Sequence, residues 1–219
     1  MAKLLYITAN PKGPEKSKGL KIGEAFLESF LEERPETIVR RIDLFDFDMA
    51  WMDAELVSAR GKLAGYGYTM EQLEEGERAK IKKMHSLTDE FIQYDYYVFV
   101  TPLWNLSSPA VLKNFLDNLF VSGKTFVYTP NGPKGLLNGK TAIHIQTRGG
   151  IYSGTPMEEL ETGDRYLRIA LRFLGIHLED SVIIEGFDVF PKKWPEMIAD
   201  GQSRARSAAK KMAASTIEV

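Results

Sequence analysis

The chain has 219 residues, 44% of them hydrophobic, and a formal net charge of −2. This length suits one large domain or two small ones, and the near-neutral charge removes the electrostatic argument for a nucleic-acid or anionic-membrane partner. Because the chain contains no cysteine, disulfides, thiolate nucleophiles, iron–sulfur clusters and cysteine-based zinc sites are excluded.

The first element in chain order is an apolar run at residues 4–8, which ends before Asn10 and Pro11. This run is too short for the core of a signal peptide, and no later stretch is long enough to span a membrane. We therefore expect a soluble, cytoplasmic protein with no membrane partner.

Strand-like and helix-like segments alternate along the rest of the chain. The predicted strands are residues 4–8, 38–44, 96–101, 141–146 and 181–184, and the predicted helices are residues 18–33, 70–93, 110–120, 163–174 and 195–214. This alternation indicates βαβ units, so the fold class is α/β with a parallel sheet. We expect a flavodoxin-like doubly wound sheet of five strands in the order 2-1-3-4-5, with helices on both faces.

Two stretches interrupt this alternation. An insertion at about residues 45–69 contains Trp51 and a short helical pattern near residues 53–63. An excursion at about residues 124–138 is too rich in turn-forming residues for a regular helix. Since no linker separates the two halves, we expect residues 1–219 to form a single domain.

Ligands of open α/β sheets bind beyond the carboxyl ends of the strands, where the strand order reverses. The loop at residues 9–18, ANPKGPEKSK, leads from the first strand into the first helix there. Asn10, Ser17 and the backbone near Gly19 could donate hydrogen bonds to a phosphate, and Lys12 or Lys16 could supply positive charge. The loop matches neither GxGxxG nor GxxxxGK[ST], and a plain polar loop with Ser17 as a helix N-cap explains it equally well.

The loop at residues 101–109, TPLWNLSSP, carries a tryptophan beside an asparagine between two prolines. Its Leu103, Trp104 and Leu106 offer flat apolar surface and Asn105 offers an amide, the mixture that a planar heteroaromatic ligand requires. The alternative, that Trp104 folds back onto the core, is equally compatible with the sequence.

The loop at residues 147–153, TRGGIYS, follows the fourth strand. Gly149 and Gly150 leave the backbone bare, so a ligand could approach their N–H groups, although an ordinary turn would look the same. Together the three loops combine phosphate donors, a platform for a ring and a bare backbone edge, which describes a site for flavin mononucleotide (FMN). The three histidines are far apart in the sequence, so we expect no metal site, and we interpret His144 as a buried, hydrogen-bonded strand residue.

Four stretches give the chain a wider resemblance: KLLYITANP, VFVTPLWNLSSPAVLKNFLDNL, FVYTPNGPKGLLNGK and IHIQTRGGIYSG. They resemble the FMN-dependent NADH:quinone oxidoreductases, also called azoreductases, over nearly the whole chain. The resemblance implies non-covalent FMN as cofactor, NADH or NADPH as electron donor, and quinone or azo compounds as acceptors in a ping-pong reaction. It also implies a homodimer with two active sites at the subunit interface.

The resemblance implies FMN contacts from all three loops, while the flavin carries the chemistry and no catalytic side chain is expected. The implied cofactor-binding residues are Asn10, Ser17, Gly19, Pro102, Leu103, Trp104, Asn105, Leu106, Thr147, Arg148, Gly149, Gly150 and Ser153. Family members commonly carry S-x-S where this chain has Ser17 and Gly19, so one hydroxyl contact is lost. Candidates for the substrate pocket are Trp51, Phe126, Tyr128 and Tyr152. A flavodoxin-like electron carrier, a quinone reductase that uses FAD, and a flavin-free protein of the same fold are the alternative functions.

Overall fold

The computed structural model describes residues 1–215. Its central sheet is parallel and has the order β2-β1-β3-β6-β7, with β8 also paired to β6. The strands are β1 (Lys3–Thr8), β2 (Ile38–Asp43), β3 (Tyr96–Pro102), β6 (Thr141–Thr147), β7 (His177–Leu178) and β8 (Val182–Ile184). The predicted doubly wound order is thereby confirmed, since β6 is the fourth strand of the predicted sheet and β7 and β8 together take the place of the fifth.

The fifth strand differs from the prediction because it is split into two short segments. β7 pairs with Thr141 and Ala142, whereas β8 pairs with the other end of β6. Between them, Nη1 of Arg168 donates to the carbonyl of Glu179 and to the hydroxyl of Ser181, both at 3.1 Å. The Arg168 side chain is therefore bonded to the residues that lie between β7 and β8.

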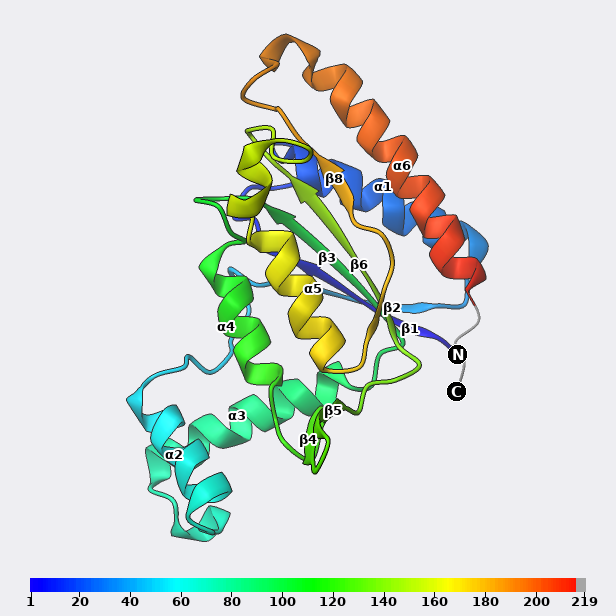
Figure 1. The fold of residues 1–219 in the computed structure, drawn as a ribbon. Helices are drawn as coiled ribbons and strands as arrows, with labels where there is room; N and C mark the ends of the chain where they lie inside the picture. Colours follow the sequence, from blue (N-terminus) through cyan, green and yellow to red (C-terminus); the bar gives the residue numbers. More distant parts are fainter. Residues whose placement is uncertain (216–219) are drawn as a thin grey trace.

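Helices cover both faces of the sheet (Figure 1). They are α1 (Lys18–Glu33), α2 (Ala54–Gly65), α3 (Glu75–Phe91), α4 (Ala110–Leu119), α5 (Gly163–Phe173) and α6 (Trp194–Ala214), with 3₁₀ turns η1 (Met70–Gln72), η2 (Pro156–Leu160) and η3 (Pro191–Lys193). The strands supply both cores by alternation: Leu5 and Ile7 pack with residues of α3, α4 and α5, whereas Leu4 and Tyr6 pack with α1 and α6. Burial on both faces explains why β1, β3 and β6 are apolar almost throughout.

The predicted helix at residues 70–93 is shorter in the structure, because α3 begins only at Glu75. A capping box causes this start: the backbone N–H of Glu74 donates to the carboxylate of Glu77 at 3.2 Å, and the Glu74 carboxylate accepts from the backbone in return. The predicted short helix in the insertion is present as α2.

The excursion forms an antiparallel hairpin of β4 (Phe126–Thr129) and β5 (Gly132–Gly135). Phe126 anchors it through ring contacts with Phe120 and Phe173. A Cβ on Gly135 would lie 2.3 Å from the carbonyl carbon of Leu174, so only glycine permits this approach to the end of α5.

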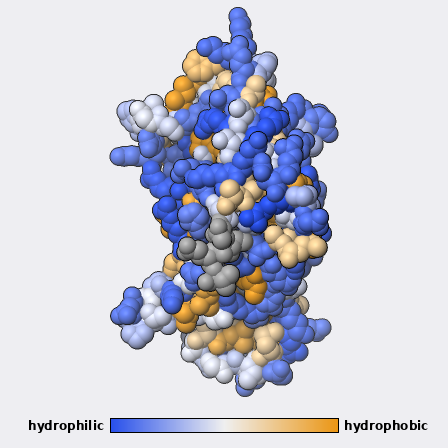
Figure 2. Space-filling model, turned by 90° about the vertical axis from the view of Figure 1, so that its right-hand side faces the viewer, coloured by the Kyte–Doolittle hydropathy of each residue, from blue (hydrophilic) through white to orange (hydrophobic). Residues whose placement is uncertain are grey.

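The side of the molecule shown in Figure 2 is mainly hydrophilic. Figure 2 shows the side of the molecule that lies to the right in Figure 1, where hydrophobic residues gather only in small groups, chiefly toward the lower end. Within residues 1–215, no helix is both long enough and apolar enough to cross a membrane.

Candidate functional site

A cleft of about 270 Å³ opens at the carboxyl ends of β1, β3 and β6. The residues that line it come from all three predicted loops and from the segment after β8: Asn10, Lys12, Lys16, Ser17, Lys18, Pro102, Leu103, Trp104, Thr147, Arg148, Gly149, Phe187 and Asp188. The cleft therefore occupies the position that the reversal of strand order predicts.

The first loop is shaped by its own side chains. The amide of Asn10 donates to the hydroxyl of Ser17 at 2.9 Å, and its oxygen accepts the N–H of Lys12 at 3.0 Å. Ser17 is the N-cap of α1 and accepts the N–H of Leu20 at 3.2 Å. The next N–H groups, of Lys18 and Gly19, have no acceptor in the described part of the chain, so they remain available to an anion at this helix N-terminus.

Three lysines, Lys12, Lys16 and Lys18, surround this end of the cleft. The ammonium of Lys18 lies 3.4 Å from the centre of the Trp194 ring, a cation–π contact. Burial and the neighbouring Lys12 lower the pKa of Lys18, while Asp188 opposes the shift. The concentration of positive charge around free N–H groups suits a phosphate.

The second loop contains a tight turn at residues 104–107. The N–H of Trp104 donates to the carbonyl of Ser107 at 2.7 Å, and the N–H of Ser107 donates back at 3.0 Å. The two central residues are left-handed, with φ of 49° at Asn105 and 69° at Leu106, a conformation that is costly for leucine. The N–H groups of both residues have no acceptor among residues 1–215.

Trp104 does not fold into the core. Its side chain is 40% exposed, and its ring meets that of Phe45 edge-on at 6.4 Å. Leu103, by contrast, is buried and lines the cleft. The structure thus decides between the two interpretations of this tryptophan in favour of an open aromatic surface beside the cleft.

The third loop approaches the segment after β8 closely. The carbonyl of Gly149 accepts the N–H of Asp188 at 2.9 Å, and a Cβ on Gly149 would lie 2.1 Å from the Asp188 carboxylate. A Cβ on Gly19 would lie 3.1 Å from the hydroxyl of Thr147. The Thr147 hydroxyl therefore stands beside the backbone of Gly19 at the N-terminus of α1.

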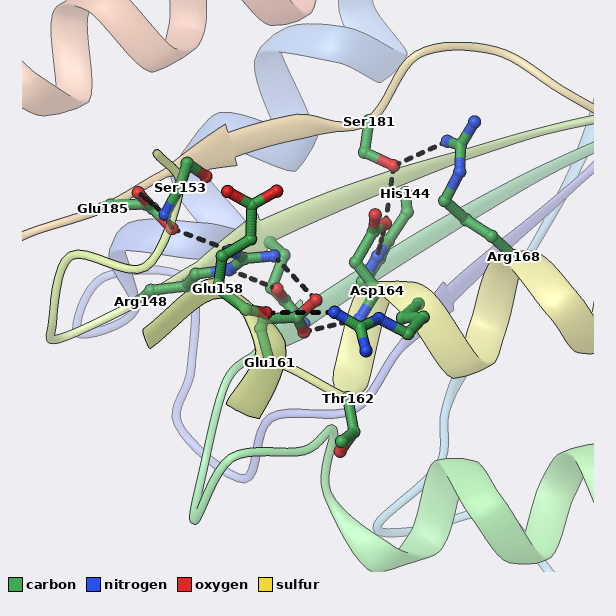
Figure 3. A network of polar contacts seen from close by, with 12 residues as sticks. His144, Arg148, Ser153, Glu158, Glu161, Thr162, Asp164, Arg168, Ser181 and Glu185 are labelled. Atoms are coloured by element: carbon green, nitrogen blue, oxygen red, sulfur yellow. Dashed lines mark hydrogen bonds and ion pairs between the residues drawn. The ribbon is translucent and has the colours of Figure 1, made fainter. Parts of the chain in front are cut away.

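The guanidinium of Arg148 is fully engaged by neighbouring side chains. It donates to Gln146 and to Glu185, each at 2.7 Å, and lies 3.3 Å from the carboxylate of Glu161 (Figure 3). Arg148 and Glu161 are both buried. This ion pair connects the third loop to the segment that precedes α5, and the Arg148 side chain acts there as a structural link.

Behind the cleft, His144 is completely buried. Its ring lies 2.9 Å from the hydroxyl of Thr101 and 2.8 Å from the carboxylate of Asp164, which also accepts from Ser181 at 2.6 Å. Burial alone would raise the pKa of Asp164, but hydrogen bonds and charge from His144, with help from Ser181 and Arg168, lower it. The interpretation of His144 as a buried, hydrogen-bonded strand residue is confirmed.

The lowered pKa predicts how an Asp164→Asn variant depends on pH. The variant is expected to lose about 1.5 kcal/mol of unfolding free energy at neutral pH, because hydrogen bonds to a carboxylate are stronger than those to an amide. A depressed pKa gives a contribution that is complete above the unfolded value of about 3.9 and is lost as the pH falls through the folded value. Urea unfolding should therefore show a difference near pH 5 that shrinks as the pH falls below about 4. A difference that keeps its full size down to about pH 2 would contradict this assignment.

The structure brings most of the predicted site residues together. Asn10, Ser17, Pro102, Leu103, Trp104, Thr147, Arg148 and Gly149 line the cleft. The others lie outside the lining: Gly19 in the first turn of α1, and Asn105, Leu106, Gly150 and Ser153 on the second and third loops. Ser153 donates its N–H to Glu185 at 3.1 Å.

None of the four substrate-pocket candidates lines the cleft. Phe126 is buried in the core, whereas Trp51 and Tyr128 are exposed. Tyr152 lies nearest, since the guanidinium of Arg148 is 5.8 Å from its ring and its side chain lies beside Gly150. Their part in substrate binding stays a prediction.

Sequence reasoning missed Phe187 and Asp188, which line the cleft beyond the end of β8. The signal was available, because residues 185–188 follow a predicted strand at the same edge of the sheet as the other loops. Among residues 1–215, no group of three or more His, Cys, Asp or Glu side chains could hold a metal ion.

Comparison with known proteins gives consistent matches over the whole sheet. A family model described as "Flavodoxin-like fold" matches residues 2–209. The FMN-dependent NADH:quinone oxidoreductase 2 of Bacillus subtilis (strain 168) is 45% identical over 96% of this chain and 99% of its own length. The FMN-dependent NADH:quinone oxidoreductase of Staphylococcus haemolyticus is 42% identical over the same shares.

Solved structures agree. An azoreductase from Bacillus anthracis str. Sterne superposes with a TM-score of 0.88 at 36% identity, over 96% of this chain and all of the other. An FMN-dependent NADH-azoreductase from Bacillus anthracis str. Ames Ancestor, solved in complex with FMN, has a TM-score of 0.86 at 31% identity, over 97% of this chain and all of the other. The expected flavodoxin-like fold is confirmed.

Proposed function

This chain belongs to the flavodoxin-like fold family and, within it, to the FMN-dependent NADH:quinone oxidoreductases, and from that premise we propose that it is a two-electron reductase with FMN as cofactor. Its donor is NADH or NADPH, and its acceptors are quinones and, by reductive cleavage, azo compounds. The reaction is ping-pong, so the donor leaves before the acceptor binds.

The donor set of the cleft fits FMN. At one end, three lysines and the free N–H groups of Lys18 and Gly19 match a phosphate. At the other end, Leu103 and Trp104 offer apolar surface beside the free N–H groups of Asn105 and Leu106. This single arrangement, an anion site and a ring platform within one cleft, is the observation that carries the proposal.

The chemistry that FMN supplies when bound is hydride acceptance from the donor and two-electron transfer to the acceptor. The chain's own residues bind and orient. The lysines would balance the phosphate charge, and the free N–H groups of Asn105 and Leu106 in the left-handed turn would be available to polar atoms of the ring. Donors held in place in this way stabilise developing negative charge.

A spectroscopic experiment tests the proposal. The purified protein, mixed with FMN and freed of excess, should show flavin absorption bands that NADH or NADPH bleaches without oxygen and that a quinone restores. Initial rates at several donor concentrations should give parallel double-reciprocal lines, the pattern of a ping-pong reaction. Absence of flavin bands would favour a flavin-free protein, and bands that neither nucleotide bleaches would favour an electron carrier.

We also propose that the protein acts as a cytoplasmic homodimer, as its resemblance implies. Several large apolar side chains are exposed in the single chain and are available to such an interface. They are Leu160 at the end of η2, Ile169 on α5 and Trp51 before α2. Light scattering after size exclusion should give twice the 24.7 kDa of one chain. A monomer mass at micromolar concentration would overturn this part of the proposal.

A further inference from the structure

Residues 161–164, with the sequence ETGD, lead from η2 into the first turn of α5 (Figure 3). They lie beside the second and third loops. Each of these residues contacts a loop or the strand that leads into one. The segment itself does not line the cleft. It can therefore act on the site only through the loops that it holds.

Thr162 holds the left-handed turn. Its backbone N–H and its hydroxyl both donate to one oxygen, the carbonyl of Leu106, at 2.9 and 2.8 Å. Leu106 and Asn105 are the two non-glycine residues of positive φ in residues 1–215. Such residues persist only where surrounding contacts fix them, and the paired bonds from Thr162 are long-range hydrogen bonds that reach this turn.

Glu161 holds the third loop. Its carboxylate pairs with Arg148 at 3.3 Å and also accepts the N–H of Asp164 at 2.8 Å. Arg148 passes the link on to Glu185, whose carboxylate accepts the N–H of Ser153 at 3.1 Å. Neighbouring residues of one short segment thus contact two of the loops that line the cleft.

Gly163 and Asp164 bring the segment close to β3 and its loop. A Cβ on Gly163 would lie 2.9 Å from the backbone nitrogen of Ser108, so the main chains pack directly together. Asp164 bonds His144, which bonds Thr101 at the end of β3. Gly163 and Asp164 therefore add two further contacts that hold the segment beside β3 and the second loop.

We propose that residues 161–164 are a positioning segment for the FMN site, and that Thr162 is the positioning residue that fixes the turn at residues 104–107 through Leu106. This inference rests on the proposed function, because it concerns the placement of donors toward FMN. Thr162 contacts Leu106 and not the cofactor. Removing its hydroxyl therefore loosens the turn at residues 104–107 before FMN binds, and leaves the lysines and N–H groups of the first loop unchanged.

Two replacements of Thr162 test the role of the hydroxyl. Thr162→Val removes it at constant shape, and Thr162→Ser keeps it. Fluorescence titration of the cofactor-free protein with FMN should give a dissociation constant about tenfold higher for Thr162→Val, the equivalent of one hydrogen bond. Thr162→Ser and the control Glu159→Gln, at an exposed position of the same connection, should stay within about twofold of the wild type.

Amide hydrogen exchange of the cofactor-free protein provides a second measurement that needs no FMN. Peptides covering residues 102–110 should exchange about tenfold faster in Thr162→Val, because one bond on the turn is lost, and at the wild-type rate in Thr162→Ser, while peptides from α6 should not change. Equal exchange in all three proteins would overturn the positioning role. If the wild type binds no FMN, the proposed function fails, and the exchange result still decides whether Thr162 fixes the turn.

Discussion

Replacing Asn105 with leucine is expected to raise the FMN dissociation constant about thirtyfold or more, the largest effect we predict for a single residue of the site. Asn105 has φ of 49°, and asparagine tolerates the left-handed region whereas leucine loses about 1–2 kcal/mol there. Leucine also removes an exposed amide that has no partner in the described residues, and a lost hydrogen bond adds about 1 kcal/mol.

The glycine variant separates these two contributions. Asn105→Gly keeps the left-handed backbone and its N–H but removes the amide, so it should bind FMN only about five- to tenfold more weakly, the equivalent of one hydrogen bond. Fluorescence titration of the cofactor-free proteins measures both values, with thermal melts to confirm folding. If both variants bind FMN as tightly as the wild type, neither the left-handed conformation nor the amide of Asn105 contributes to binding.

Replacing Arg148 with methionine is expected to lower the free energy of unfolding by about 3–5 kcal/mol, the cost of removing one partner from a buried ion pair. The side chains of Glu161 and Glu185 are 8% and 14% exposed and would lose the guanidinium that pairs with them. Gln146 would lose the donor to its oxygen as well. Urea unfolding of the cofactor-free protein provides the measurement.

Neutralising the two carboxylates serves as the control for this second prediction. A triple variant, Arg148→Met with Glu161→Gln and Glu185→Gln, should recover most of the loss, because uncharged groups are cheaper to bury than unpaired charges. Arg172→Met, on the exposed face of α5, should change stability by less than about 0.5 kcal/mol. A loss of similar size in the triple variant would show that packing of the Arg148 side chain, and not charge, is what matters.

The sequence allowed the sheet to be predicted because its strands are buried on both faces. β1, β3 and β6 are continuous apolar runs, and the more polar β2 lies at the edge, as predicted. The split between β7 and β8 was not predicted, and the residues between the two strands accept hydrogen bonds from Arg168, a residue of another element. The hairpin of β4 and β5 was also not anticipated, because the close approach of Gly135 to Leu174 exists only after α5 has packed.

For the site, local pattern was sufficient to place three loops but not to assign roles within them. The resemblance implied that Arg148 contacts the cofactor, and Arg148 does line the cleft. Its guanidinium is also bonded to Gln146, Glu161 and Glu185, two of which come from other segments, and these partners could not be predicted. Similarly, nothing near Leu106 in the sequence indicates that Thr162, 56 residues away, holds its carbonyl.

The sequence by itself thus determined the α/β architecture, the edge of the sheet where the cleft lies and the loops that form it, because hydrophobic periodicity and strand order are local or topological properties. Only the tertiary structure decided that Trp104 stays exposed and that residues 161–164 hold two of the loops. These features depend on contacts between residues far apart in the chain, and a side chain's partners across such distances are fixed only when the elements pack.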